Sequence, residues 1–424
     1  MTIPPPSKAN DVNVSTREEL WASIEKFCSW LADYGSTSYD PYDIWGTRYG
    51  CWARRLYYDK HPLGVVMTAP LILAEMICPG IRALFVDKNR FPTADAQLAL
   101  AFLNLSGAHL GVRDNTSIQG TPVSYLMRAK DLAAGLLGQS VSGYSGYCWG
   151  YPFDWQNVRG FVPKDTPHIT ATPYCYEVFT QLFDLTGEQQ YLDVALSIAG
   201  FFSDDLNDTP TGKDSAAGSY TPIDHSKVIN ASAYRAFVLF DAARRFGNET
   251  WRTKAGKNLR FILQNQKPDG SWLYAIDDPH DTFIDNFHTC FVLKNLYKLN
   301  RHVQSDDVDR AIRDGYRFYR TALIDEQDNP RLFVRAPRTE IVRLEMYCFA
   351  EAITLGALLR DDIPEAFQLA ERLAKKLIRH HQLADGHWVT RVYIGGISHT
   401  VPFLRWPQSQ LFYALTNLLV ALEQ

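Results

Sequence analysis

The segment Gln266-Lys-Pro-Asp-Gly-Ser-Trp272 recurs later in the chain as Gln382-Leu-Ala-Asp-Gly-His-Trp388. Both copies read Q-x-x-D-G-x-W, and each follows the second helix of an expected helical pair. Two pairs of about 55–60 residues fit between the copies, which indicates a repeat architecture. Asp-Gly favours a tight turn, and a Trp can fold back onto adjacent helices. We therefore expect both loops to be structural, with a ligand-facing role for Trp272 as the alternative.

Around these loops, apolar residues recur at three- and four-residue intervals, as in Val228, Ala231 and Tyr234, which is typical of amphipathic helices. Gly187 and Gly247 stand where helices should stop. Strand-like alternation is scarce. The expected helices span 16–34, 50–60, 66–78, 93–106, 121–138, 170–186, 188–203, 227–246, 250–266, 283–299, 304–322, 339–358, 363–382 and 406–423.

Paired helices of this kind stack, and closure of the stack brings the loops of every pair onto one face. The loops here are long and rich in Trp, Tyr, Asp and His. We therefore predict an all-α fold, an (α/α) toroid of six-hairpin type, with long loops lining a central cleft on one face. No Gly/Ser-rich linker is visible, so a single domain is expected over 15–424 after a disordered tail over 1–14. The less regular region 1–140 is expected to complete the same ring.

Composition excludes several other classes of protein. The formal charge of −4 argues against a nucleic-acid partner, which would call for a basic stripe. The seven cysteines are scattered and never in C-x-x-C spacing, which favours reduced thiols in a reducing compartment. No signal peptide is visible, and the longest apolar stretch, 64–78, is too short and too interrupted to span a bilayer. We expect a cytoplasmic protein without a membrane span.

The most aromatic loop lies within 144–176, where Gly and Pro residues mark irregular structure. Aromatic surface at this density in a loop favours a ligand site, with core packing as the alternative. His168 stands just before a helix, where either capping or chemistry is possible. The candidate residues of this loop are Tyr147, Trp149, Tyr151, Asp154, Trp155 and His168.

Two later clusters add polar candidates. The first contains Tyr220, Asp224 and Asn230, although Asp224 or Ser226 could equally cap the helix expected near 227. The second contains Asp285, Asn286 and His288. Asp285 and His288 are three residues apart and therefore share one helical face. Such polar groups are costly on an apolar helix unless they face a cavity or pair with each other. We favour a cavity.

Metal and cofactor motifs are weak or missing. Asp204-Asp-Leu-Asn-Asp208 has the D-D-x-x-D form of magnesium–diphosphate sites, but it stands at a helix end without a partner motif, so a solvated loop is expected. H-E-x-x-H, Cys/His zinc spacings, a P-loop and G-x-G-x-x-G do not occur in the sequence. We expect neither a metal nor another cofactor. The basic run 372–379 is expected to be an exposed helix face.

Residues 146–299 resemble the bacterial polysaccharide-biosynthesis family called VpsJ. The resemblance rests on segments 146–156, 166–172, 219–231, 266–272 and 284–289, and Tyr39-Asp-Pro-Tyr-Asp43 is similar to the family's opening motif. Cys290, where Gly is expected, and segment 331–345 depart from the family pattern. The resemblance implies a toroid related to six-hairpin glycosidases and a place in exopolysaccharide or lipopolysaccharide assembly. The Q-x-x-D-G-x-W loops also resemble those of terpene cyclases, whose D-x-D-D acid is missing here.

The leading hypothesis is a carbohydrate-active, glycoside hydrolase-like enzyme acting on a polysaccharide or lipid-linked glycan, and association with a polysaccharide assembly complex is part of this hypothesis. Hydrolysis needs a protonated and an ionised carboxyl group. Asp154 is the candidate acid, Asp285 the candidate base oriented by His288, and Asp224 the reserve. Aromatics such as Trp149 would stack on sugar rings. The alternatives are a uronate-directed lyase or C5-epimerase using His168 or His288 with Tyr147, a non-catalytic glycan-binding or scaffold protein, and a terpenoid-type cyclase.

Overall fold

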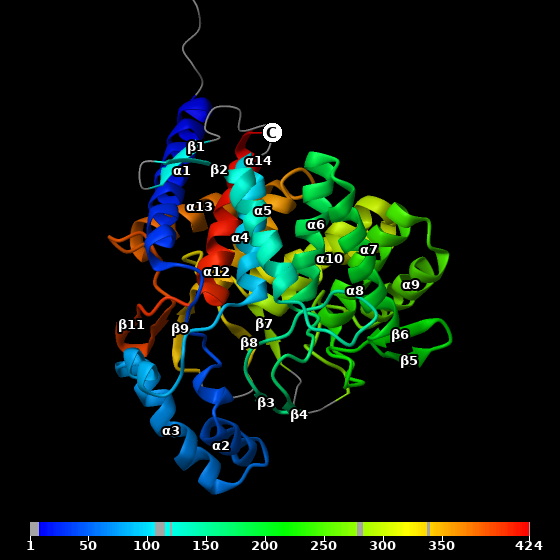
Figure 1. Ribbon diagram of the computed structural model, residues 1–424, viewed down its shortest axis with the longest axis horizontal. Helices are drawn as coiled ribbons and strands as arrows, with labels where there is room; N and C mark the ends of the chain where they lie inside the picture. The colour runs from blue at the N-terminus through cyan, green and yellow to red at the C-terminus, as the bar shows by residue number, and fades with distance from the viewer. Residues whose placement is uncertain (1–7, 107–114, 119–120, 278–282, 337–339, 424) are drawn as a thin grey trace, which may run out of the picture.

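Helices dominate the part of the chain that the computed structural model describes, residues 8–106, 115–118, 121–277, 283–336 and 340–423. An inner ring of helices encloses the centre (Figure 1). Each of these helices contacts the next, and the last contacts the first, so the ring is closed. Its members are α4 (Pro92–Ser106), α6 (Thr172–Thr186), α8 (Ile229–Phe246), α10 (Asn286–Val303), α12 (Met346–Leu358) and α14 (Ser409–Glu423).

An outer layer of helices packs on this ring, each antiparallel to an inner partner. Five of the pairs are consecutive in sequence, whereas α14 pairs with α1 from the other end of the chain. The structure is therefore the predicted (α/α) toroid, with its last hairpin assembled from both ends of the described chain. The outer helices are α1 (Lys8–Tyr34), α5 (Tyr125–Gly138), α7 (Gln189–Asp204), α9 (Glu249–Gln264), α11 (Asp306–Ala322) and α13 (Pro364–His381).

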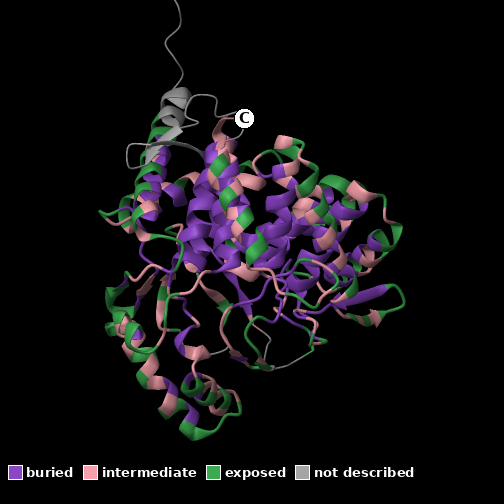
Figure 2. Cartoon of the chain, viewed as in Figure 1, coloured by how far each residue is buried: buried purple, intermediate pink, exposed green. Residues whose placement is uncertain are grey.

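The two layers differ in how their sequences are patterned. Inner helices such as α4 are buried on almost every side, which matches their nearly continuous apolar sequences. Outer helices bury one stripe, as Leu369, Leu373 and Leu377 do on α13 at four-residue spacing. Figure 2 shows the result as a buried inner ring and a mixed outer layer. A continuous core extends from Leu20 to Leu419.

Helix α1 begins at Lys8, within the segment 1–14 that was expected to be a disordered tail. Residues 8–14 are therefore helical, and residues 1–7 lie outside the described part of the chain. The other helices begin and end within a few residues of the expected bounds, except α12. It begins at Met346 rather than near 339 because a short strand precedes it.

Short antiparallel ladders occupy the loops, and most lie at one end of the ring (Figure 1). In the ladder of the aromatic loop, Trp155 pairs with Val162 and Gln156 with Phe161. Strand β10 pairs with both β9 and β11. The strands are β1 (Asn115–Ile118), β2 (Thr121–Ser124), β3 (Trp155–Asn157), β4 (Gly160–Val162), β5 (Asp208–Gly212), β6 (Ser215–Gly218), β7 (Ile284–Asp285), β8 (Phe333–Arg335), β9 (Val342–Glu345), β10 (Arg391–Tyr393) and β11 (Ser398–His399).

Helices α2 (Arg48–Tyr58) and α3 (Pro62–Ile77) do not join the ring, although region 1–140 was expected to complete it. They form a separate hairpin that projects from the loop face, followed by the 3-10 helix η2 (Pro79–Leu84) (Figure 1). Among the described helices, none is long and apolar enough to cross a membrane.

The two Q-x-x-D-G-x-W loops make matching contacts. The Gln266 side-chain amide donates to the carbonyls of Gly270 and of Ala311 on α11. The Gln382 amide donates in the same way to Gly386 and to Ser23 on α1. Each loop therefore joins the end of one outer helix to the next outer helix around the ring, which is the structural role that the repeat predicted.

Candidate functional site

A cavity of about 880 Å³ opens on the loop face of the toroid. Its wall comes from the loops that precede the inner helices, from the first turns of those helices and from the α2–α3 hairpin. The volume falls within the range of ordinary small-molecule pockets, roughly 300–1,000 Å³. Aromatic side chains make up much of the wall: Tyr42, Tyr57, Tyr58, Tyr151, Phe153, Trp155, Phe161, Tyr174, Tyr220, Tyr234, Tyr274, Phe283, Phe287, Phe291, Phe333, Tyr347 and Trp406.

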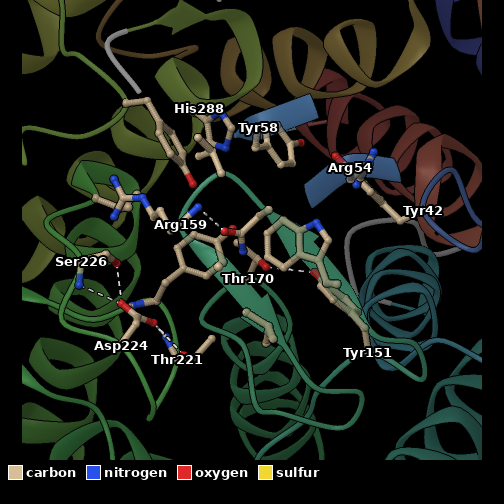
Figure 3. A pocket seen from close by; sticks show the side chains of 18 of the residues that line it. Tyr42, Arg54, Tyr58, Tyr151, Arg159, Thr170, Thr221, Asp224, Ser226 and His288 are labelled. Atoms are coloured by element: carbon tan, nitrogen blue, oxygen red, sulfur yellow. Dashed lines mark hydrogen bonds between the residues drawn. The ribbon is translucent and has the colours of Figure 1, made fainter. Parts of the chain in front are cut away.

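Asp285 and His288 form a hydrogen-bonded pair in the cavity wall. Asp285 caps α10 by accepting the backbone N–H of His288 at 2.9 Å. Its other oxygen lies 2.6 Å from Nδ1 of the same histidine. A carboxylate acceptor at Nδ1 places the imidazole proton there and leaves the Nε2 lone pair available. Among the described residues, His288 makes no other side-chain hydrogen bond, and it lines the cavity (Figure 3). Asp285 lines the cavity too.

The His288 ring lies among aromatic rings, which restrict its orientation. Its centroid is 4.6 Å from that of Tyr274 and 4.5 Å from that of Phe287. The Asp285 carboxylate beneath it is almost fully buried. The carboxylate contact at Nδ1 and the surrounding rings therefore hold the imidazole in one orientation. The predicted placement of both residues at a cavity agrees with this geometry.

The cavity wall also contains a buried cation, the guanidinium of Arg405. Arg405 donates to both oxygens of Asp40 at 2.6 and 2.7 Å. Burial disfavours the charged guanidinium, but the Asp40 carboxylate outweighs this and raises the pKa of Arg405. The guanidinium also lies 4.6 Å from the centre of the Tyr151 ring. A fixed cation with an aromatic neighbour is a suitable contact for an anionic or hydroxyl-rich ligand.

Further cations line the same cavity. Arg159 pairs with Asp277 at 3.0 Å, and Arg54 lies over the Trp45 ring. Lys60 lines the wall from the α2–α3 turn. The carboxylates in the described lining are Asp224 and Asp285, and the cations outnumber them. Two of these cations are paired with carboxylates outside the lining, Arg159 with Asp277 and Arg405 with Asp40.

Asp224 organises its own loop. Its oxygens accept hydrogen bonds from the backbone and hydroxyl of Thr221, from the backbone and hydroxyl of Ser226, and from the backbone of Tyr220 (Figure 3). Burial raises the pKa of this carboxyl, but the hydrogen bonds together lower it below its ordinary value. Asp224 is thus an ionised loop anchor at the cavity edge. Neither it nor Ser226 caps α8, whose N-cap is Val228.

Asp154 does not line the cavity. Its Oδ1 accepts the backbone N–H of Lys164 at 2.9 Å and so joins the two sides of the β3–β4 hairpin. Its neighbour Trp155 does line the cavity, because successive side chains in a strand point to opposite faces. The geometry therefore does not favour Asp154 as the catalytic acid paired with Asp285.

His168 lies behind the cavity wall. Its ring is buried and stacks on Tyr151 with centroids 4.8 Å apart, and it also contacts Trp155 and Tyr220. Burial lowers the pKa of His168 to about 3, so the imidazole is neutral near pH 7. Its Nδ1 is buried without a hydrogen-bond partner in the described structure. The residue supports three cavity-lining aromatic rings without reaching the cavity itself.

Several other predicted ligand contacts are structural. Trp149 is fully buried and its indole N–H donates to Leu136, and Trp272 donates likewise to Ile262. Asn286 is buried and donates to Leu323. These side chains face packed helices, so they are corrections to the expected substrate contacts.

Two predicted contacts lie beside the cavity, and three line it. Tyr147 is partly exposed but outside the lining. Asn230 lines a small pocket behind Asp285, where its amide atoms have no partner among the described residues. Tyr151, Trp155 and Tyr220 line the main cavity as expected.

The sequence did not single out some residues that the structure brings to the cavity. Tyr347 and Trp406 stack in parallel with centroids 3.8 Å apart, and both line the wall with Arg405. Tyr42 also lines the cavity wall. Its segment 39–43 resembles the opening motif of the VpsJ family, but no role could be assigned to it from the sequence. Phe333 shows that the divergent segment 331–345 reaches the cavity too. In the sequence, the signal for this part of the wall was the charged Arg405 next to a Trp just before a helix. A charge at such a position is costly unless it is paired.

No family model matches the sequence, and no curated protein matches it either. Membership of the VpsJ family therefore stays a prediction. Several solved structures do match in fold. A D-mannose isomerase has a TM-score of 0.59 at 14% identity, covering 100% of this chain and 99% of that one.

A cellobiose 2-epimerase from Bacillus thermoamylovorans has a TM-score of 0.56 at 12% identity, covering 78% of this chain and 87% of that one. An α-mannanase from Bacteroides thetaiotaomicron has a TM-score of 0.54 at 10% identity, covering 78% and 86%. At such identities the likeness concerns the fold alone. The chain thus shares the (α/α) toroid fold of these structures.

Proposed function

We propose that this protein is a carbohydrate-active enzyme that transfers a proton at a sugar carbon of an anionic glycan, as an epimerase or a lyase. The observation that supports this most directly is the Asp285–His288 pair in the cavity wall. The surrounding cations and aromatic rings support the choice of substrate. A place in bacterial exopolysaccharide or lipopolysaccharide assembly, which the VpsJ resemblance implies, belongs to the same proposal.

The chemistry requires a carbon acid, and a uronate provides one at C5, next to its carboxylate. Nε2 of His288 removes the C5 proton, and Asp285 stabilises the imidazolium that forms. A cation such as Arg405 neutralises the substrate carboxylate as negative charge develops on it. In a lyase the electron pair of the C5–H bond forms the C4=C5 double bond, the C4–O bond breaks, and the leaving oxygen takes a proton.

In an epimerase a proton returns to C5 from the opposite face of the ring. A cavity tyrosine is suited to supply it in either reaction. Burial raises the pKa of Tyr220 well above its ordinary value, which keeps this phenol protonated near neutral pH. The proton then held by His288 is released to solvent or returned to the tyrosine to complete the cycle.

The two-carboxylate hydrolase is less well supported. A glycosidase needs one carboxyl group as an acid and another as a base or nucleophile. In the described lining, Asp224 is ionised and bound by its loop, and Asp285 is bound by His288. Asp154, the expected acid, lies outside the lining.

Solvent exchange in D2O tests the proposal. Oligosaccharides containing glucuronate or mannuronate are incubated with the protein, and NMR follows deuterium at C5 while ultraviolet absorbance follows C4=C5 double bonds. We expect one of the two signals, and a decrease of about 10²–10⁴-fold in the His288→Gln variant. His302→Gln is the matched control, because His302 also contacts a carboxylate, Asp241, but outside the cavity.

Glycan cleavage without exchange or a double bond would contradict proton transfer at C5 and favour hydrolysis. Binding without any turnover would favour a glycan-binding protein.

A further inference from the structure

The α2–α3 hairpin has an unusual exposed surface. Helix α3 has no ionisable residue from Pro62 to Ala74, yet much of it is exposed. Val66 is 64% exposed and Ile77 68%. The apolar face, as we name it, continues onto α2 and η2 and comprises Tyr49, Trp52, Leu63, Val65, Val66, Ile72, Leu73, Ile77, Leu84 and Phe85. Exposed apolar patches of this extent mark interaction sites.

The packing of α3 explains why this face stays open. Gly64 and Thr68 are buried on the side toward α2, and a side chain at Gly64 would collide with the α2 backbone. At 100° per residue, the exposed apolar positions of α3 occupy about half of its circumference on the other side. Glu75, the acid of this helix, turns inward to pair with Arg82 and with His399. The open half is therefore uncharged.

The hairpin projects from the ring, and Figure 2 shows it as a mixture of exposed and intermediate residues with few buried ones. A helix with half its circumference apolar can lie in a bilayer surface with that half toward the acyl chains. A helix of 16 residues is about 24 Å long, shorter than a bilayer core of roughly 30 Å, so it would lie in one leaflet.

Charge complementarity indicates the kind of lipid. Arg48, Arg55, Lys60 and Lys88 are exposed around the apolar face, against the exposed acids Asp59 and Asp87. This basic excess contrasts with the net charge of −4 for the whole chain. Trp52 and Tyr49 add aromatic rings of the kind that settle at headgroup level. Apolar residues with a basic surround are the pattern of interfacial helices on anionic membranes.

We propose that the α2–α3 hairpin docks the protein onto an anionic lipid bilayer, with the apolar face inserted into one leaflet. Lys60, His61 and Val65 belong to the hairpin and also line the cavity. Docking therefore places the bilayer surface beside the cavity. The proposal does not depend on the reaction, because binding can be measured without turnover.

Co-sedimentation with vesicles tests the docking. We expect binding to vesicles of equal parts phosphatidylglycerol and phosphatidylcholine, and weaker binding to phosphatidylcholine alone or at high salt. The triple variant Val66→Ser, Leu73→Ser, Ile77→Ser should bind at least tenfold more weakly. The matched control is Leu137→Ser, Leu185→Ser, Leu196→Ser, which changes three exposed leucines on ring helices and should bind like the parent protein.

A second measurement keeps the test independent of variant folding. Brominated lipids should quench part of the tryptophan fluorescence of the parent protein, and that part should be missing in Trp52→Phe. Absence of vesicle binding by the parent protein, or equal binding by the triple variant, would overturn the proposal. So would a dimer in solution that the triple variant converts to monomers, since a second copy would then cover the face.

Discussion

At the scale of single residues, Arg405 in the cavity wall forms a buried ion pair with Asp40. Asp40 is fully buried, so removal of its partner leaves an uncompensated charge. We expect Arg405→Gln to lower the free energy of unfolding by about 3–5 kcal/mol, measured by urea denaturation. The double variant Asp40→Asn, Arg405→Gln should recover part of this loss. Arg310→Gln changes an exposed arginine with an exposed partner and should have little effect.

If the single and double variants lost the same free energy of unfolding, the unpaired Asp40 carboxylate would not be the cause of the loss.

His168 should make stability depend on pH. Below its ordinary pKa of 6.5 the imidazole of the unfolded chain binds a proton, whereas the folded imidazole stays neutral down to about pH 3. The unfolded state binds more protons in this range, so the free energy of unfolding falls as the pH falls through it. Replacing His168 by Phe should reduce the loss between pH 7 and pH 4.5 by about 2–3 kcal/mol, measured by urea denaturation at both pH values.

If His168→Phe lost as much free energy of unfolding between pH 7 and pH 4.5 as the parent protein, folded His168 would be taking up a proton normally.

The sequence could predict those site residues whose geometry is local. Asp285 and His288 meet across one turn of α10, so their spacing alone placed them together. Arg405 and Asp40 are 365 positions apart, and only the closed ring brings them into contact. Asp154 was misplaced for a related reason: its loop sequence does not show which strand face turns toward the cavity.

At the scale of elements, the Q-x-x-D-G-x-W loops depend on their glycines. Gly386 has a φ of +116°, and a side chain there would collide with the Lys26 carbonyl of α1. We expect Gly386→Ala to cost more stability than Gly395→Ala, by about 1–3 kcal/mol in urea denaturation. Gly395 also has a positive φ, 78°, but open space around it, so it isolates the backbone contribution. Equal losses of stability in the two variants would show that the Lys26 carbonyl of α1 moves aside at little cost.

Helices were predictable because their signals are short-range. The expected helix 227–246 corresponds to α8, which ends at Gly247 in a left-handed cap. The strands were not predictable in the same way, because ladders of two to five residues have no periodicity to read. Strand β9, for example, pairs with β10 across a complete helical hairpin, so its partner is far away in the sequence.

For the whole molecule, the last hairpin of the toroid depends on contacts between the two ends of the described chain. Phe27 of α1 is buried, with its ring 4.6 Å from that of Trp388 and 5.0 Å from that of Phe412. We expect Phe27→Ala to lower the free energy of unfolding by about 3–5 kcal/mol. Phe85→Ala removes the same side chain from an exposed position and should cost less than about 0.5 kcal/mol.

Thermal unfolding followed by calorimetry measures both variants. A second, separate transition in Phe27→Ala would contradict a core that unfolds as one unit.

The pairing of α1 with α14 has a consequence for the order of the chain. Arg17 forms a 2.6 Å ion pair with Glu423, so the first and last described helices are already neighbours. A short peptide joining them, with a new break in the exposed turn between Lys213 and Asp214, would yield a circular permutant that retains each hairpin. Translation order would then be incidental, since a circle of hairpins has no first member.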